Sequence, residues 1–117
     1  MKKKLKTVCI TGAGNGIGKA IATLMNKSGY NVACCDIDLK SAKDTIDNFS
    51  NLDAEAMAIE IDVTKNTEIQ NMINKVVNKF DQLDVLVNNA GVTRPAHILE
   101  LTENDWNWIY DVNAKGT

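Results

Sequence analysis

Apolar runs of strand length alternate with segments of helical spacing along most of this chain. The strand-like runs cover residues 7–11, 31–36, 57–63 and 85–88, and the helical spacing covers residues 17–25, 39–49 and 69–80. Regular alternation of this kind is typical of a parallel sheet with right-handed crossovers and helices on both faces. The sequence therefore predicts a doubly wound α/β fold, here an incomplete one with about four strands in the order 3-2-1-4.

A further helix is predicted near the end of the chain. Thr102, with Asp105 three residues later, resembles the start of a helix, and Trp106, Ile109 and Asn113 then share one helical face. With 117 residues, the chain is long enough for one globular core and too short for two domains of ordinary size. We therefore expect residues 1–117 to form one domain or part of one.

The composition indicates which kinds of molecule the protein can bind. The formal net charge is -2, and the basic residues are dispersed apart from four lysines among the first six residues, so the sequence does not indicate nucleic-acid binding. The apolar run behind these lysines ends at Gly12, too soon for a signal peptide, and no run reaches the roughly 18 apolar residues of a membrane helix. We expect a soluble cytoplasmic protein whose partners are small molecules or other protein chains.

The three cysteines, Cys9, Cys34 and Cys35, lie inside predicted strands and have neither Cys-x-x-Cys spacing nor a neighbouring histidine. We expect them to be buried as small apolar side chains in a reducing compartment. A metal or redox pair is the disfavoured alternative, because adjacent strand residues such as Cys34 and Cys35 point to opposite faces of a sheet. The sequence predicts no metal site.

Residues 11–18 read Thr-Gly-Ala-Gly-Asn-Gly-Ile-Gly, between the first predicted strand and the first predicted helix. A glycine-rich turn lets backbone N–H groups approach an anion closely, and the start of a helix adds a favourable dipole. The turn lies at the carboxyl end of the first strand, where open α/β sheets bind ligands, so a pyrophosphate site is predicted. A tight connection that needs glycine for conformational reasons alone is the other interpretation.

Two better-known phosphate loops do not match this spacing. A Walker A loop would need glycine where Ala13 stands, and serine or threonine where Ala20 stands. A Gly-x-Gly-x-x-Gly turn fails as well, because Ile17 or Lys19 occupies the place of its third glycine. The pattern is instead Thr-Gly-x-x-x-Gly-x-Gly.

Asp36 ends the second predicted strand. A carboxylate at this place can accept hydrogen bonds from the ribose diol of an adenosine. Its charge favours NAD over NADP, because a 2'-phosphate at a separation of about 4 Å would be repelled by about 4 kcal/mol near a protein surface. The remaining alternative is that Asp36 only forms a surface turn with Asp38.

Asn88-Asn89-Ala90-Gly91 follows the fourth predicted strand. Together with the glycine-rich turn, Asp36 and the segments at residues 62–63 and 111–117, it makes the chain resemble the short-chain dehydrogenase/reductase family over essentially its whole length. The resemblance implies a Rossmann-type fold and an NAD-dependent oxidoreductase that transfers a hydride between nicotinamide and an alcohol or carbonyl carbon. It also implies a homo-oligomer when the fold is complete.

The resemblance also implies which residues contact the cofactor. These are Thr11, Gly12, Gly14, Asn15, Gly16, Ile17 and Gly18 at the pyrophosphate turn, Asp36 at the ribose, Asp62 and Val63 at the adenine, and Asn88, Ala90 and Gly91 on the adenosine side of the groove. A segment such as Asn-Asn-Ala-Gly at the end of a strand also commonly forms a turn, and in this family it braces the sheet. Both roles can hold together.

Catalysis is expected to need residues beyond this stretch. The family uses a serine and a Tyr-x-x-x-Lys pair, but Tyr30 is followed by Cys34 at the lysine position and Tyr110 by Ala114. Of the family's catalytic residues only Asn113 has a match, and there it would help to hold a water of the proton relay; an asparagine at the end of a helix is the plainer alternative. We therefore expect no dehydrogenase turnover from the 117-residue chain alone.

Two other functions stay open. A nucleotide-binding remnant without catalysis would share these motifs, and a fragment of an S-adenosylmethionine-dependent methyltransferase would also carry a glycine-rich turn and an acidic residue after the second strand. The methyltransferase fits less well, because those enzymes usually have an acidic residue where Thr11 stands and lack Asn-Asn-Ala-Gly. With any of these functions, about four parallel strands alone would leave apolar surface and a sheet edge uncovered, so marginal stability or association is expected.

Overall fold

Strands and helices alternate along the chain in a computed structural model that describes residues 5–90 and 103. In chain order they are β1 (Thr7–Thr11), α1 (Gly16–Lys27), β2 (Asn31–Asp36), α2 (Leu39–Asp47), β3 (Ala56–Glu60), α3 (Asn66–Phe80) and β4 (Val85–Val87). The four strands form one parallel sheet in the order β3-β2-β1-β4. The predicted α/β class and the predicted strand order are both confirmed. Of the helix predicted from Thr102 onward, only Glu103 is among the described residues, where it is helical, and the rest lies outside them.

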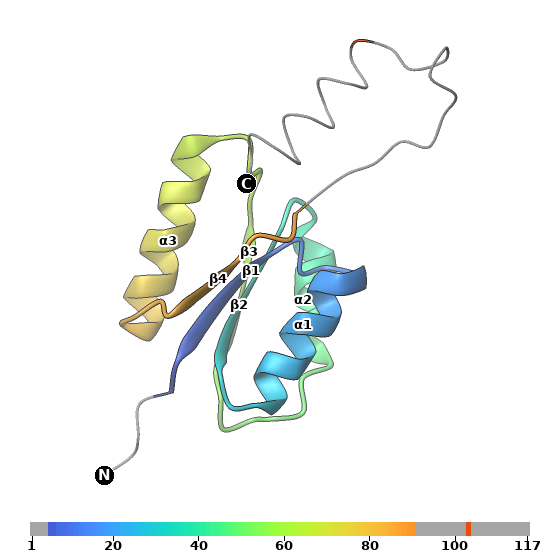
Figure 1. Cartoon of the computed structure of the whole chain (residues 1–117), viewed down its shortest axis with the longest axis vertical. Coiled ribbons are helices and arrows are strands. Elements are labelled where there is room, and N and C mark those ends of the chain that lie inside the picture. The colour runs from blue at the N-terminus through green and yellow to red at the C-terminus, as the bar shows by residue number, and fades with distance from the viewer. Residues whose placement is uncertain (1–4, 91–102, 104–117) are drawn as a thin grey trace.

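The sheet lies between two helical layers, with α1 and α2 on one face and α3 on the other (Figure 1). Because successive side chains of a strand point to opposite faces, β1 and β2 contribute to both layers of the core. The core on the α1 and α2 side contains Val8, Ile10, Val32, Cys34, Ala22 and Ala42. The core on the α3 side contains Cys9, Ala33, Cys35, Ile59, Met72, Val76 and Phe80.

All three cysteines are fully buried free thiols, as predicted. Cys34 and Cys35 do point to opposite faces, but the Sγ atoms of Cys9 and Cys35 lie 3.5 Å apart, a contact that the sequence did not indicate. Burial raises the pKa of the Cys34 thiol to about 12. The hydrogen bond with Cys9, together with burial, raises the pKa of Cys35 as well. Cys34 and Cys35 therefore stay protonated and act as small core residues.

The prediction of a strand over residues 57–63 was wrong at its end, because β3 stops at Glu60. The N–H of Ile61 still donates to the carbonyl of Asp36, at 3.0 Å. Asp62 then turns the chain, since its Oδ1 accepts hydrogen bonds from both the backbone N–H and the hydroxyl of Thr64. This local side-chain turn competes with continued strand pairing.

Two other elements end earlier than predicted. Helix α2 ends at Asp47, and Phe49 lies beyond it, half-buried against the core, with its N–H donating to the carbonyl of Ile46 at 3.0 Å. Phe49 fits the apolar spacing of the helix because the chain just after the helix also packs against the core. Strand β4 ends at Val87, so Asn88 lies outside it. No helix within the described residues is long and apolar enough to cross a membrane.

Candidate functional site

The glycine-rich turn leads from β1 into α1 at the carboxyl edge of the sheet. Gly12 has a φ of +68° and Gly16 a φ of +57°, which favour glycine at both positions. Gly16 is exposed, and apart from its chain neighbours and the backbone of its own helix, no atom lies within 4 Å of the place where a side chain would begin. The turn therefore needs glycine for its conformation and also leaves open space at its tip.

Gly18 lies in the first turn of α1, where the helix packs directly on the glycine-rich turn. A Cβ atom on Gly18 would lie 2.1 Å from the carbonyl oxygen of Gly12 and 2.5 Å from Nδ2 of Asn89. Real Cβ atoms do not approach other atoms so closely, so this contact requires glycine. The absence of a side chain thus fixes the start of α1 against the ends of β1 and β4.

The start of α1 is not capped by a side chain. Asn15 is the N-cap residue, but its exposed side chain makes no capping hydrogen bond, and the first turn holds no acidic residue. The first helical hydrogen bond runs from the N–H of Lys19 to the carbonyl of Asn15, at 3.2 Å. The N–H groups of residues 16–18 therefore lack partners within the helix, and they point with the helix dipole toward any anion at its start. Ile17, between the two glycines, is 73% exposed.

Asp36, the last residue of β2, connects this strand to two turns. Its Oδ2 accepts a hydrogen bond from the N–H of Gly14 at 2.9 Å, and its Oδ1 accepts one from the N–H of Asp38 at 3.0 Å. The surface turn with Asp38 considered above is therefore present. The same carboxylate is also held against the glycine-rich turn, which a plain surface turn does not require.

Residues 88–90 brace the end of β4 against β1. The hydroxyl oxygen of Thr11 accepts hydrogen bonds from the N–H groups of Asn89 and Ala90, each at 3.0 Å, and donates to the carbonyl of Val87 at 3.4 Å. Nδ2 of Asn89 donates to the carbonyl of Gly12 at 3.3 Å. The expected bracing role is thus present, and it occupies the hydroxyl of Thr11. Asn88 is exposed.

Asp62 and Val63 follow β3 and are both half-buried. The hydrogen bond from the Thr64 hydroxyl holds the pKa of Asp62 below its ordinary value, so this carboxylate is ionised at neutral pH. The N–H of Asp62 donates to Oε1 of Glu68 in α3, at 3.3 Å. The turn after β3 is therefore held by its own side chains and by α3.

The predicted site residues within the described part of the chain thus follow the carboxyl ends of neighbouring strands of one sheet, which is where α/β folds bind ligands. Gly91 and Asn113 lie outside the described residues. The sequence analysis missed Asn89 as the residue that ties the turn to β4, and Asp38 as the N-cap of α2. The second could have been found, because an aspartate directly before a helical segment is a common helix start.

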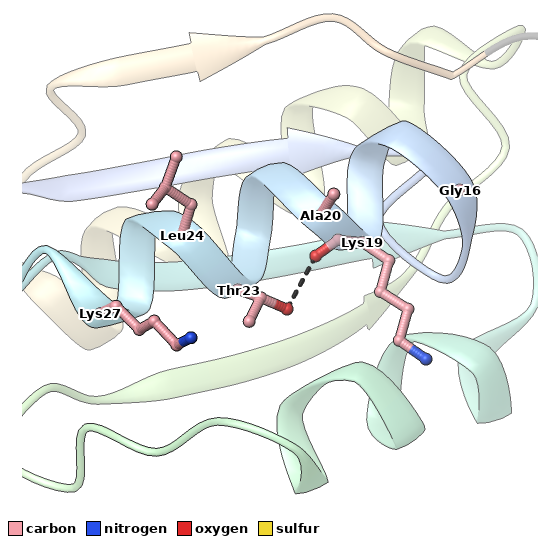
Figure 2. Close-up of a pocket in the computed structure, with 6 residues that line it drawn as sticks. All are labelled: Gly16, Lys19, Ala20, Thr23, Leu24 and Lys27. Carbon is pink, nitrogen blue, oxygen red and sulfur yellow. Dashed lines mark hydrogen bonds between the residues drawn. The ribbon is translucent and has the colours of Figure 1, made fainter.

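A shallow hollow lies along the outer side of α1, lined by Gly16, Lys19, Ala20, Thr23, Leu24 and Lys27 (Figure 2). The Thr23 hydroxyl donates to the carbonyl of Lys19 at 2.9 Å, so it is already engaged within the helix. The hollow shares only Gly16 with the glycine-rich turn. The candidate site residues lie instead at the carboxyl edge of the sheet.

The strand order, the glycine-rich turn and the acidic residue after β2 define a Rossmann-type α/β domain. The chain matches the family model described as short chain dehydrogenase over residues 6–117, and it belongs to this family.

Two relatives illustrate the similarity. The chain is 36% identical over 115 residues to a 3-oxoacyl-acyl-carrier-protein reductase of Staphylococcus epidermidis, which covers 95% of this chain and 46% of that protein. It is also 36% identical over 110 residues to the CLA biosynthesis dehydrogenase/reductase of Lactiplantibacillus plantarum, covering 94% of this chain and 38% of that protein. The chain therefore spans about half, or less, of the length of the relatives it matches.

Solved structures show the same fold. A short chain dehydrogenase/reductase from Burkholderia phymatum in complex with NAD matches with a TM-score of 0.89 and 31% identity, covering 97% of this chain and 40% of that one. A 3-ketoacyl-(acyl-carrier-protein) reductase from Brucella melitensis complexed with NADH matches with a TM-score of 0.86 and 29% identity, covering 95% of this chain and 45% of that one. Both similarities support the family and its Rossmann-type fold.

Proposed function

We propose that this chain is the NAD-binding part of an oxidoreductase that transfers a hydride between nicotinamide and an alcohol or carbonyl carbon. One observation carries the proposal: α1 begins without a capping side chain at an open glycine, and the carboxylate of Asp36 is held against the same turn. A pyrophosphate suits the first of these groups and a ribose diol suits the second. A dinucleotide joins both within one molecule.

Different residues would hold different parts of the cofactor. The N–H groups of residues 16–18 would bind the pyrophosphate, Asp36 the adenosine ribose, Asp62 and Val63 the adenine, and Asn88, Ala90 and Gly91 the groove beside it. The cofactor would supply the hydride, and the protein would hold and orient it. Complexes of two structural neighbours with NAD and NADH support this assignment.

The preference for NAD over NADP follows from Asp36. A 2'-phosphate on the ribose would place negative charge beside this carboxylate, and the Asp38 carboxylate lies only two residues further on. Both oxygens of Asp36 accept from backbone N–H groups, and among the described residues the carboxylate forms no ion pair with a cation. The local charge therefore disfavours NADP.

Proton transfer would need groups that these 117 residues do not supply. Asn113 is proposed to hold a water of the proton relay, and no Tyr-x-x-x-Lys pair occurs in these 117 residues. We propose that this chain binds NADH but does not by itself reduce a carbonyl substrate. The names of the relatives, which include 3-oxoacyl reductases, support a carbonyl or alcohol as the substrate class.

Calorimetric titration of the 117-residue chain with NADH tests the proposal. We expect one NADH per chain and a loss of binding in Gly16→Val, because a branched side chain would fill the open space at the start of α1 and would also disfavour the positive φ. Ala20→Ser, on an exposed position of the same helix, should bind normally. Binding of S-adenosylmethionine instead of NADH would reverse the assignment.

A further inference from the structure

Gly14 contacts the proposed ribose-binding carboxylate directly. Its N–H donates to Oδ2 of Asp36 at 2.9 Å, and the residue is buried against Asp36 and Ser41 of α2. An N–H group that is engaged in this way is not available to a phosphate. Gly14 is therefore not used in the same way as the N–H groups of residues 16–18.

The contact leaves no room for a side chain at Gly14. A Cβ atom there would lie 2.7 Å from Oδ2 of Asp36 and 2.6 Å from Cβ of Ser41. The φ angle of Gly14 is not in the left-handed region, so its backbone conformation does not require glycine. The close approach to Asp36 and to α2 is what requires it.

A second turn holds the other oxygen of the same carboxylate. Oδ1 of Asp36 accepts from the N–H of Asp38, at 3.0 Å. Asp38 is itself fixed as the N-cap of α2, since its Oδ1 accepts from the N–H groups of Lys40 and Ser41 and its Oδ2 accepts from the Ser41 hydroxyl at 2.9 Å. The carboxylate of Asp36 is thus clamped between two turns.

The clamp leaves the carboxylate able to bind a diol. A carboxylate has about four acceptor positions, and the two backbone N–H groups use two of them, so about two remain for the hydroxyl groups of a ribose. A carboxylate that is already held in one orientation binds the diol without a further ordering cost. Its charge also cannot rotate away from a 2'-phosphate, which makes it a stronger barrier to NADP.

We propose that Gly14 is a positioning residue for Asp36 and that it sets the selectivity for NAD over NADP. This inference rests on the proposed function. In Gly14→Ala, the new methyl group would displace the carboxylate from the orientation that accepts the ribose hydroxyls, while the start of α1 keeps its free N–H groups. Gly14→Ala should therefore reduce the selectivity for NAD over NADP more than it reduces the affinity for dinucleotides in general.

The test compares NADH and NADPH binding by the 117-residue chain, its Gly14→Ala and Asp36→Asn variants and the double variant. We expect the unmodified chain to prefer NADH by roughly tenfold or more, and Gly14→Ala to weaken NADH binding by about tenfold with less than about a twofold change for NADPH. Because Gly14 acts through Asp36, adding Gly14→Ala to Asp36→Asn should change the NADH affinity by less than about twofold. Unchanged selectivity in Gly14→Ala would overturn this inference alone.

A fourth variant separates positioning from packing. Gly14→Ala with Ser41→Gly removes the conflict with the Ser41 Cβ atom but keeps the conflict with Asp36, and Ser41→Gly alone controls for the lost Ser41–Asp38 hydrogen bond. We expect this variant to remain unselective, and recovery of NADH selectivity would show that packing against α2 was the cause. Thermal melting and far-ultraviolet circular dichroism check that each variant is folded.

One measurement needs no substitution at Gly14. In proton–nitrogen correlation spectra, the Gly14 amide proton of the chain should shift upfield in Asp36→Asn, because a charge-assisted hydrogen bond becomes a neutral one. A resonance that does not move would contradict the clamp. Failure of the unmodified chain to bind either dinucleotide would overturn the proposed function and, with it, the selectivity role.

Discussion

The four glycines of the turn serve different physical needs at the scale of single residues. Gly12 and Gly16 have positive φ angles, whereas Gly14 and Gly18 do not and are required because another atom lies where a side chain would be. Only Gly16 is open to an incoming ligand. The four glycines of this repeat are therefore needed for two different reasons: two for their backbone conformation and two for lack of space. One of the first two, Gly16, also leaves room for a ligand.

Gly18→Ala should destabilise the folded chain. An alanine normally stabilises a helix by up to about 1 kcal/mol relative to glycine, but here its methyl group would overlap the Gly12 carbonyl, so we expect a net loss of about 1–3 kcal/mol. Urea denaturation measures this difference in the free energy of unfolding. Ala20→Ser, exposed on the same helix, should change it by less than about 0.5 kcal/mol. A stabilised Gly18→Ala variant would contradict the close packing of α1 on the turn.

Thr11→Val should also weaken the fold, through hydrogen bonding rather than packing. Valine keeps the shape of threonine but removes the acceptor of the Asn89 and Ala90 N–H groups, and we expect a loss of about 1–3 kcal/mol in the free energy of unfolding. Thr11→Ser keeps the hydroxyl and loses one methyl group, so it should cost about 1 kcal/mol or less. Equal losses in the two variants, by urea denaturation, would argue that the methyl group matters more than the hydroxyl.

The sequence placed the candidate site residues at the ends of neighbouring strands, but it did not predict their hydrogen-bond partners. The glycine pattern and Asp36 could be placed at neighbouring strand ends because a parallel sheet aligns those ends. The sequence could not indicate that Gly14 donates to Asp36 or that Asn89 contacts Gly12. Each contact joins segments that are distant in the chain and depends on how closely the ends of β2 and β4 approach the turn.

At the scale of elements, the two helices on the same face of the sheet begin in opposite ways. Helix α2 begins with Asp38, whose carboxylate accepts from two backbone N–H groups, while α1 begins with an asparagine that makes no such bond. A cap of this kind typically stabilises a helix. Its absence at α1 means that the helix lacks this stabilisation and that its first N–H groups remain available as hydrogen-bond donors. Both helices begin at the carboxyl edge of the sheet, and of these two only α1 keeps its first N–H groups without a side-chain cap.

The periodicity of apolar residues was enough to predict that each strand and helix exists. Where each one ends depends on local side chains. The strand predicted through residue 63 ends at Glu60 because Asp62 and Thr64 form their own hydrogen-bonded turn. Apolar spacing alone cannot detect such competition, since Ile61 is buried whether or not it belongs to the strand.

The turn after β3 should make stability depend on acid pH. The pKa of Asp62 is lower in the folded chain than the ordinary value of about 3.9, so the unfolded chain binds the proton first as the pH falls. This stabilising contribution is present in full well above pH ~4 and is lost as the pH falls through the folded pKa. The melting temperatures of the unmodified chain and of Asp62→Asn should therefore converge between about pH 6 and pH 3.

A matched variant controls for general acid effects. Asp53→Asn removes a carboxylate that accepts no hydrogen bond within the described residues, so it controls for the loss of one negative charge. A gap between the unmodified chain and Asp62→Asn that widens as the pH falls would reverse the sign of the proposed linkage.

At the scale of the whole molecule, the edge of the sheet at β4 exposes apolar side chains. Strand β4 pairs only with β1 among the described strands, and it is three residues long with Val85 36% and Leu86 45% exposed. On α3, Ile73 and Val77 are also more than a third exposed. Apolar exposure is not confined to this side, because Leu24 on α1 and Ile37 and Leu52 in the connections are exposed to a greater degree.

Leu86→Lys should reduce self-association of the 117-residue chain, because a charged residue on an exposed strand edge discourages pairing with another copy. We expect the unmodified chain to sediment as a concentration-dependent mixture that includes species larger than a monomer, and Leu86→Lys to shift it toward the monomer. Leu52→Lys is the matched control, since Leu52 is 90% exposed in the connection between α2 and β3, away from the sheet edge at β4. If association followed total apolar exposure rather than the strand edge, Leu52→Lys would reduce it at least as much, because Leu52 is the more exposed of the two. Sedimentation velocity at several concentrations separates these causes, and a monomeric unmodified chain would contradict the role of the β4 edge directly.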